Sequence, residues 1–176
     1  MPDFRSILKE EGNFSPAGEI LDKLLSAAEE IYIKPRTPII ESGRINSNVY
    51  IVKEGIIRLL HFEQDKEITF GFASPGTFLL SPHSYYMNIP AFLQAETCKT
   101  PATVLRISKS RFDSLLAESH ELALWMLNLA IGQLFSCERK LYLINGTAKE
   151  RYSSVLKNRP EIIRAVPAKV IASYLG

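Results

Sequence analysis

Residues 49–58 read VYIVKEGIIR, and this stretch decides the fold class. Valine, isoleucine and tyrosine favour β-strands, and Gly55 separates two runs of these residue types. The pattern predicts one strand over residues 49–53 and a second over residues 56–62, joined by a tight turn. This part of the chain is therefore expected to consist of short strands connected by turns.

The same pattern extends outward over residues 30–107, where glycines and prolines interrupt short runs of isoleucine, valine, phenylalanine and tyrosine. Many short strands joined by turns are typical of small antiparallel barrels and jelly rolls, which protect the edges of their sheets. We therefore expect an α+β protein with an antiparallel β-barrel or double-stranded β-helix (jelly roll) and flanking helices. The further strands are predicted over residues 32–33, 67–73, 91–97 and 103–107, with a hairpin tip at residues 63–66.

Helices are predicted on both sides of the strands. Ser15 followed by Pro16 is a typical helix start, because a hydroxyl can cap the helix and proline fits its first turn. After Ser108, glycines and prolines nearly vanish and the apolar residues recur with the helical period of 3.6. Ser108 is predicted to cap one helix, and a longer helix is predicted over residues 119–144.

The predicted long helix is apolar on two sides, so both sides must be covered. One side can lie on the strand domain, whereas the other needs a second helix. A second copy of the chain in a two-fold dimer with coiled-coil packing is the simplest cover, and the later helices of the same chain are the alternative. We expect a homodimer, and the candidate dimer-helix residues are Leu122, Leu124, Leu127, Leu129, Ile131, Leu134 and Leu141. One side carries Leu124, Leu127, Ile131, Leu134 and Leu141, and the other carries Leu122, Met126, Leu129 and Ser136.

Charge is distributed unevenly along the chain. The net charge is +2, but residues 1–136 hold 13 Lys and Arg against 16 Asp and Glu, whereas residues 137–176 hold 8 against 3. The last 30 residues predict a basic helix over 147–158, a break at Pro160 and a short amphipathic helix closed by Gly176. That order is typical of the first half of a DNA-binding helix-turn-helix. The candidate phosphate-contacting residues are Lys149, Arg151, Lys157, Arg159, Arg164 and Lys169, with a solvated helical surface as the alternative.

Composition and spacing exclude several classes of protein. The longest apolar run has 14 residues, short of the roughly 20 that a membrane span needs, and the N-terminus lacks the apolar segment of a secretory signal. We therefore expect a cytoplasmic protein without membrane contact. Cys98 and Cys137 form no CxxC pair, and His61, His83 and His120 lack the spacing of a metal site. We expect two reduced thiols, no metal and no enzymatic activity, with a small metal-dependent barrel enzyme as a third alternative.

A strand domain, a long helix, a basic connector and the start of a helix-turn-helix, in that order, resemble the Crp/Fnr family of bacterial transcription regulators. The resemblance rests on Gly43 followed by residues 49–58, on residues 75–78 (PGTF), on residues 104–108 (VLRIS) and on residues 171–176 (IASYLG). It implies a cyclic-nucleotide-binding-like sensor domain over residues 1–118, a dimerisation helix over 119–146 and the N-terminal part of a winged helix-turn-helix over 147–176. DNA is then the expected partner, bound with sequence specificity only once the helix-turn-helix is complete.

The chain departs from the family in the loop that holds a cyclic nucleotide. In members that bind one, a Gly-Glu pair and an arginine contact the ribose and the cyclic phosphate. The matching positions here carry Leu80-Ser81 and Phe92, and no lysine or arginine occurs between Leu79 and Thr97. Because a buried phosphate needs N–H donors and a cation, we predict that the chain binds neither cyclic AMP nor cyclic GMP in the family's way. No cofactor is predicted.

Two interpretations of this loop are open: its residues line a pocket for an uncharged effector, or they fill the interior of the barrel. The resemblance implies a Crp/Fnr-type DNA-binding transcription regulator whose sensor domain lacks the phosphate-binding residues. The alternative is an effector-sensing or dimeric interaction module that does not bind DNA. The candidate pocket residues are Leu80, Ser81, His83, Tyr85, Tyr86, Met87 and Phe92.

Overall fold

The computed structural model describes residues 4–10, 16–64 and 66–176. In this part of the chain the strands form two four-stranded antiparallel sheets, ordered β1-β8-β3-β6 and β2-β7-β4-β5. The expected antiparallel architecture is present, but the described strands do not close into a barrel, because each sheet keeps two edge strands. The strands are β1 (Glu29–Ile33), β2 (Pro38–Ile40), β3 (Val49–Glu54), β4 (Ile57–Glu63), β5 (Lys66–Ala73), β6 (Phe78–Leu79), β7 (Gln94–Thr97) and β8 (Ala102–Ile107).

Strand β3 is buried on both of its faces, which explains its continuous apolar run. Tyr50 and Val52 lie in a core between the two sheets, whereas Val49 and Ile51 lie in a second core beneath the helices. Successive side chains of a strand point to opposite faces, so a strand covered on both sides needs apolar residues at every position. The residues that decide the fold therefore connect its two cores.

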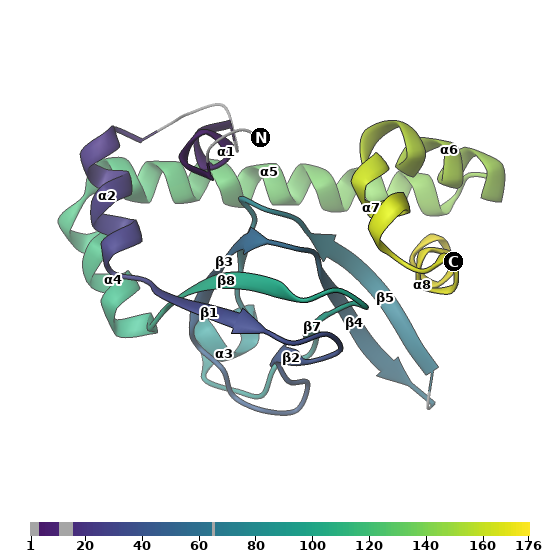
Figure 1. The fold of residues 1–176 in the computed structure, drawn as a ribbon, viewed down its shortest axis with the longest axis horizontal. Coiled ribbons are helices and arrows are strands. Elements are labelled where there is room, and N and C mark those ends of the chain that lie inside the picture. The colour runs from purple at the N-terminus through teal and green to yellow at the C-terminus, as the bar shows by residue number, and fades with distance from the viewer. Residues whose placement is uncertain (1–3, 11–15, 65) are drawn as a thin grey trace.

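Helices cover the roll of strands at both ends and along one side. In Figure 1 the long helix α5 runs the length of the molecule, with α2 and α4 at one end and α6 to α8 at the other. None of the helices within the described residues is long and apolar enough to cross a membrane. The helices are α1 (Phe4–Glu10), α2 (Gly18–Ser26), α3 (Pro82–Met87), α4 (Lys109–Glu118), α5 (His120–Ile144), α6 (Ala148–Asn158), α7 (Pro160–Ala165) and α8 (Ala168–Leu175).

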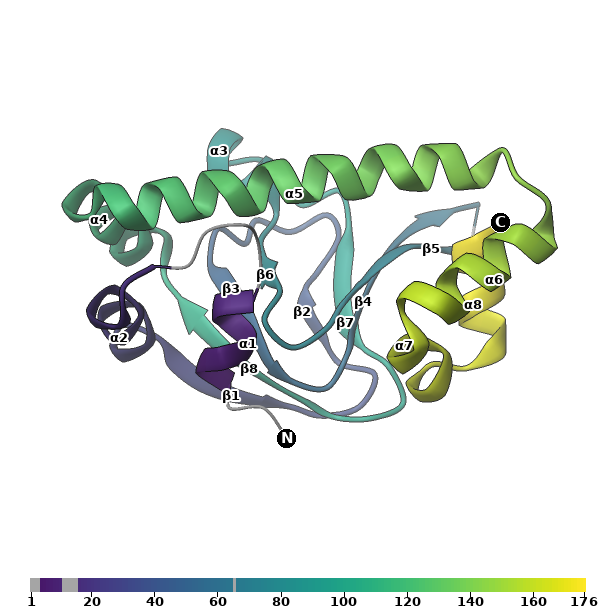
Figure 2. The ribbon, with the colours of Figure 1, turned by 90° about the horizontal axis from the view of Figure 1, so that it is seen from above.

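Helix α5 packs on the roll through the second of its two predicted apolar sides. Leu122 and Trp125 are fully buried, and the Trp125 ring meets the Phe78 ring edge-on with centroids 5.4 Å apart. Met126 and Leu129 pack against the same core. Figure 2 shows the helix along one side of the roll, with α7 and α8 beside β5 at its far end. The side that carries Leu124, Leu127 and Leu134 stays exposed. The alternative in which later helices of the same chain cover this side is therefore wrong.

The C-terminal helices lie on the outer face of the second sheet, opposite the inter-sheet core. Ile162 of α7 and Ile171 of α8 are buried there against Ile56 and Cys98, and Val166 completes the cluster. Both cysteines are free thiols, as expected. The helices of residues 148–175 are thus attached to the strand domain by a core of their own.

One predicted helix cap, Ser108, is confirmed by its hydrogen bond, and the structure adds two caps, at Ser119 and Thr147, that were not predicted. Ser108 and Ser119 each accept a backbone N–H from the following turn, at 3.3 and 3.2 Å, and so begin α4 and α5. Thr147 and Glu150 form a reciprocal capping box at the start of α6. Polar side chains that satisfy the free N–H groups of a first turn explain why α4, α5 and α6 begin at these residues.

Other expectations were wrong in detail. The predicted cap Ser15 lies outside the described residues, and α2 begins at Gly18 without a side-chain cap. The strand predicted over 91–97 begins only at Gln94, and Pro160 begins α7 instead of only ending a helix. The structure also contains α1, α3, β2 and β6, which were not predicted; the two strands have three and two residues, too few to show a period.

Candidate functional site

The loop after the Pro-Gly turn is folded by its own polar residues. Ser81 caps α3 by accepting the N–H of Ser84 at 3.3 Å, and Pro82 occupies the first helical turn. The Ser84 hydroxyl donates to the carbonyl of Ile89 at 3.0 Å, and Asn88 ends the helix in the left-handed conformation. The hydroxyl of Ser81 therefore caps α3, and the Ser81 side chain is buried.

Tyr85 joins α3 to α4 and is part of the core beneath the helices. Its hydroxyl donates to the carboxylate of Asp113, which also forms an ion pair with Lys109 at 2.7 Å, and the Lys109 ammonium lies 4.0 Å from the centre of the Tyr85 ring. The hydrogen bond from Lys109, and then that from Tyr85, lowers the pKa of Asp113, while burial and the Asp113 carboxylate raise the pKa of Tyr85. At neutral pH Asp113 is therefore a charged carboxylate that accepts hydrogen bonds from Lys109 and Tyr85.

Phe92 lies at the surface between two histidines. Its ring stacks on His61 with centroids 5.7 Å apart, and its centroid lies 6.0 Å from that of His83. The Phe92 side chain is 58% exposed, and Tyr86 and Met87 are also exposed. The candidate pocket residues therefore divide into two groups. Leu80, Ser81 and Tyr85 belong to the interior of the fold, whereas His83, Tyr86, Met87 and Phe92 are exposed.

A buried guanidinium lies on the outer face of the second sheet, and its charge is already neutralised. Arg58 is 5% exposed, donates to the Thr69 hydroxyl at 3.0 Å and pairs with the Glu67 carboxylate at 2.6 Å. The carboxylate of Glu96 lies 3.6 Å away and is bonded by the Gln94 amide. Strands β4, β5 and β7 supply these side chains, so no local spacing in the sequence could have found the cluster. With two carboxylates beside it, Arg58 offers no free charge to an anion.

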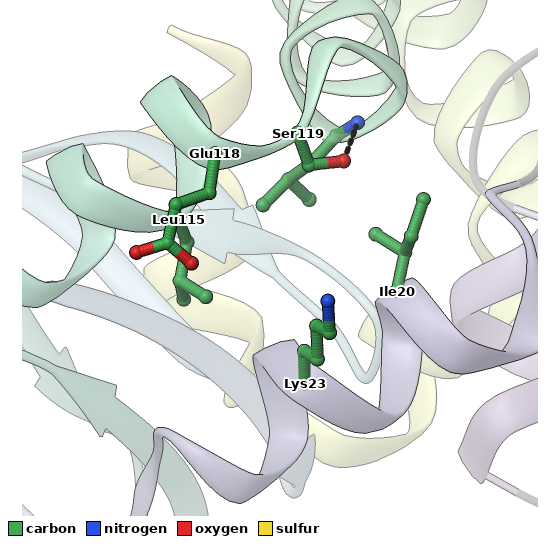
Figure 3. A pocket seen from close by; sticks show the side chains of 6 residues that line it. Ile20, Lys23, Leu115, Glu118 and Ser119 are labelled. Atoms are coloured by element: carbon green, nitrogen blue, oxygen red, sulfur yellow. Dashed lines mark hydrogen bonds between the residues drawn. The ribbon is translucent and has the colours of Figure 1, made fainter.

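A small hollow lies elsewhere, among α2, α4 and α5. It has a volume of about 190 Å³, and Figure 3 shows Lys23 reaching toward the space below Ser119. Ser119 itself is occupied as the cap of α5. Three helices contribute its walls, which is why sequence reasoning missed it. The lining residues are Ile20, Lys23, Leu115, Glu118, Ser119 and Leu122.

The histidines and acidic side chains do not assemble a metal site within the described residues. No three His, Cys, Asp or Glu side chains gather there in a way that could hold an ion. His61 and His83 lie on either side of the Phe92 ring, and His120 is the first residue of α5.

Two of the six candidate DNA-contacting residues, Arg151 and Arg159, form hydrogen bonds or ion pairs with other residues of the chain. Arg151 donates to the carbonyl of Gly176 at 2.9 Å, and Arg159 pairs with Glu161 at 2.7 Å and donates to the Ser74 hydroxyl at 3.3 Å. The remaining four cations are exposed on α6, α7 and α8: Lys149, Lys157, Arg164 and Lys169.

Helix α5 exposes a long apolar side. All five residues predicted for this side are exposed, with Leu127 at 55% and Leu134 at 64%. Phe135 and Tyr142 extend the same apolar surface. Leu122 and Leu129, the other candidate dimer-helix residues, face the roll instead.

Solved structures share this fold at low sequence identity. FixK2 from Bradyrhizobium japonicum has a TM-score of 0.71 at 20% identity, covering 85% of this chain and 77% of its own. The c-di-GMP responsive global regulator CLP from Xanthomonas campestris has a TM-score of 0.68 at 17% identity, covering 82% and 74%. The catabolite activator protein of Thermus thermophilus has a TM-score of 0.62 at 19% identity, covering 84% and 68%. These structural neighbours are regulators of the Crp/Fnr type.

The family follows from the sequence of the strand domain itself. No curated protein sequence matches the chain. The sequence profile of the cyclic nucleotide-binding domain, in contrast, matches residues 30–119, which is just over half of the chain and spans every strand except the first residue of β1. The chain belongs to the cyclic nucleotide-binding domain family.

Proposed function

We propose that this chain is a dimeric Crp/Fnr-type DNA-binding transcription regulator whose sensor domain lacks the usual cyclic-nucleotide phosphate contacts. The observation that carries the proposal is the path of α5. This helix begins at the sensor domain, presents an exposed apolar side along its length and ends at the basic helices of residues 148–175. One element thus connects the sensor, the expected dimer contact and the expected DNA-binding module. The role is regulatory and not catalytic.

The C-terminal segment supports the DNA-binding part of the proposal. Residues 137–176 carry eight Lys and Arg against three Asp and Glu, and four of the cations are exposed on consecutive short helices. Helix α8, which Pro167 precedes and Gly176 follows, is taken in this proposal as the first helix of a helix-turn-helix. An exposed basic surface beside such a helix is what phosphate contacts require.

The sensor domain is proposed to respond to an uncharged or apolar effector, or to none. The exposed side chains of His83, Tyr86, Met87 and Phe92 offer aromatic and thioether contacts and include no lysine or arginine. Exposed aromatic side chains with few polar groups suit a ligand that needs no charge compensation. A change in the occupancy of this surface would act on the C-terminal helices through rigid-body movement of α5.

Fluorescence anisotropy with a labelled DNA duplex of arbitrary sequence tests the proposal. The chain is expected to bind weakly at low salt, with affinity that falls steeply as salt rises because phosphate contacts release counterions. Replacing two exposed cations of α6, Lys149→Ala with Lys157→Ala, is expected to lower the slope of log affinity against log salt by about 2.

The matched control removes two exposed lysines from the sensor domain, Lys34→Ala with Lys99→Ala, and keeps the net charge equal to that of the test variant. This control should leave the salt slope close to that of the wild type. An equal loss in both variants would refute the C-terminal DNA surface. No binding at any salt concentration would instead favour an effector-sensing or interaction module without DNA binding.

A further inference from the structure

Strand β5 is an edge strand of the second sheet, and α8 lies along its free edge. An edge strand presents backbone N–H and C=O groups that have no partner strand. Here part of that edge is satisfied by a side chain of the C-terminal segment. The hydroxyl of Ser173 accepts the N–H of Thr69 and donates to the carbonyl of Glu67, both at 3.0 Å. One hydroxyl therefore takes the place that a neighbouring strand would occupy.

Three other contacts close the same interface from the helix side. The Tyr174 ring meets the Phe72 ring edge-on, with centroids 5.3 Å apart. The Lys140 ammonium of α5 donates to the carbonyl of Phe70 and lies 4.5 Å from the centre of the Phe70 ring and 4.6 Å from that of Tyr174. Arg159 reaches the Ser74 hydroxyl just beyond the end of β5. Helices α5 and α8 and the N-cap residue of α7 thus contact β5 and the following Ser74 through one aromatic contact and several polar contacts.

The surface beneath this interface is apolar and includes a thiol. Cys98 is 8% exposed and lies in the cluster that Ile56 forms with Ile162, Val166 and Ile171. Burial raises the pKa of the Cys98 thiol, so in the closed arrangement it is both covered and protonated at neutral pH. Separation of α7 and α8 from the sheet would expose this sulfur to solvent.

We propose that Ser173 and its two hydrogen bonds to the β5 edge form a latch that holds the C-terminal helices closed over the second sheet, and that opening of the latch exposes Cys98. The latch is a conformational device of the chain itself. It goes beyond the proposed function and does not depend on DNA binding. The closed state satisfies the edge of β5 and buries the apolar cluster, whereas the open state frees the C-terminal helices to change their position relative to the sensor domain.

The rate of Cys98 alkylation by N-ethylmaleimide in the full chain, followed by peptide mass spectrometry, measures this opening. Removing the hydroxyl with Ser173→Ala is expected to raise the rate about 3- to 10-fold, as the loss of one or two net hydrogen bonds would do. Alanine is a better helix former than serine, so the substitution does not weaken α8 itself. An increase therefore reports the lost contacts to β5.

Two references make the result decisive. Ser153→Ala makes the same chemical change at an exposed position of α6 and should leave the Cys98 rate unchanged. Cys137 of α5, labelled in the same sample, should react at the same rate in every variant. A Cys98 rate in Ser173→Ala equal to that of the wild type would overturn the latch. So would an equal acceleration in Ser153→Ala, or a parallel acceleration of Cys137, which would indicate loss of the fold as a whole.

Discussion

At the scale of single residues, Gly55 controls the connection between the two sheets. It joins β3 of one sheet to β4 of the other, with a φ of +85° that residues with a side chain rarely adopt. A Cβ at this position would lie 2.6 Å from the carbonyl oxygen of Pro101 and 2.9 Å from Ala102. Both the backbone conformation and the close approach of the neighbouring strand therefore require glycine.

Gly43 allows the effect of the backbone conformation to be measured separately, because it has a positive φ but no close neighbour. Its φ is +79°, and a Cβ would meet nothing within 4 Å. We expect Gly43→Ala to cost about 1–2 kcal/mol of unfolding free energy from the left-handed conformation alone. Gly55→Ala should cost clearly more, because its Cβ also clashes with backbone that cannot rotate away. Urea denaturation of both variants measures the difference, and equal losses would contradict the role assigned to the Pro101 contact.

Residues of the candidate site show how far sequence reasoning reaches. The sequence alone shows that positions 80, 81 and 92 lack residues that bind a phosphate, because this depends only on residue identity. The sequence could not predict whether Tyr85 or Tyr86 faces the interior, because two adjacent aromatic residues show no periodic pattern. In the structure Tyr85 packs in the core beneath the helices, and its hydroxyl donates to Asp113, 28 residues away. The Arg58 cluster could not be predicted either, because its residues come from three different strands.

At the scale of elements, the helical half was more predictable than the sheets. A helix of 25 residues such as α5 repeats its apolar period many times, and its starting cap Ser119 is local. Strands β2 and β6 pair with distant partners and have almost no pattern of their own. Helix α3 could have been found, because Ser81-Pro82 repeats the cap-and-proline signal that was used to predict a helix at Ser15-Pro16.

Helix α5 carries a testable consequence for assembly. In a two-fold dimer, Leu127 and Leu134 would be buried against the same residues of the second copy. Leu127→Glu with Leu134→Glu places unpaired charge in that contact and is expected to raise the dimer dissociation constant at least about 100-fold, given about 1.5–3 kcal/mol for each buried leucine. Analytical ultracentrifugation of wild type and variant measures the change.

The control places glutamate at an exposed apolar residue outside the helix. Ile45→Glu changes a side chain that is as exposed as Leu127 but lies in the loop between β2 and β3. This variant should sediment as the wild type does. A wild type that remains monomeric at tens of micromolar, or a double variant that stays dimeric, would disprove dimerisation through α5.

At the scale of the whole molecule, the residues that determine the fold differ from those that would bind a ligand. The cyclic nucleotide-binding domain profile matches residues 30–119, and its strands are set by apolar alternation and turn residues. Ligand binding depends on a few side chains in one loop, which can change while the sheets remain. Here that loop uses Ser81 to cap α3 and places the Phe92 ring between two histidines. Membership of the family therefore does not by itself supply a phosphate site.

Isothermal titration calorimetry with cyclic AMP and cyclic GMP tests this separation directly. A buried cyclic phosphate without a cation would lose its hydration and gain no charged hydrogen bond in return, which costs several kcal/mol. The buried Arg58 cannot compensate, because Glu67 and Glu96 already hold it on the outer face of the second sheet. We expect neither cyclic nucleotide to give more heat than linear AMP, which serves as the control for weak anion binding. Micromolar binding of either cyclic nucleotide would mean that donors outside residues 79–97 supply the phosphate contacts.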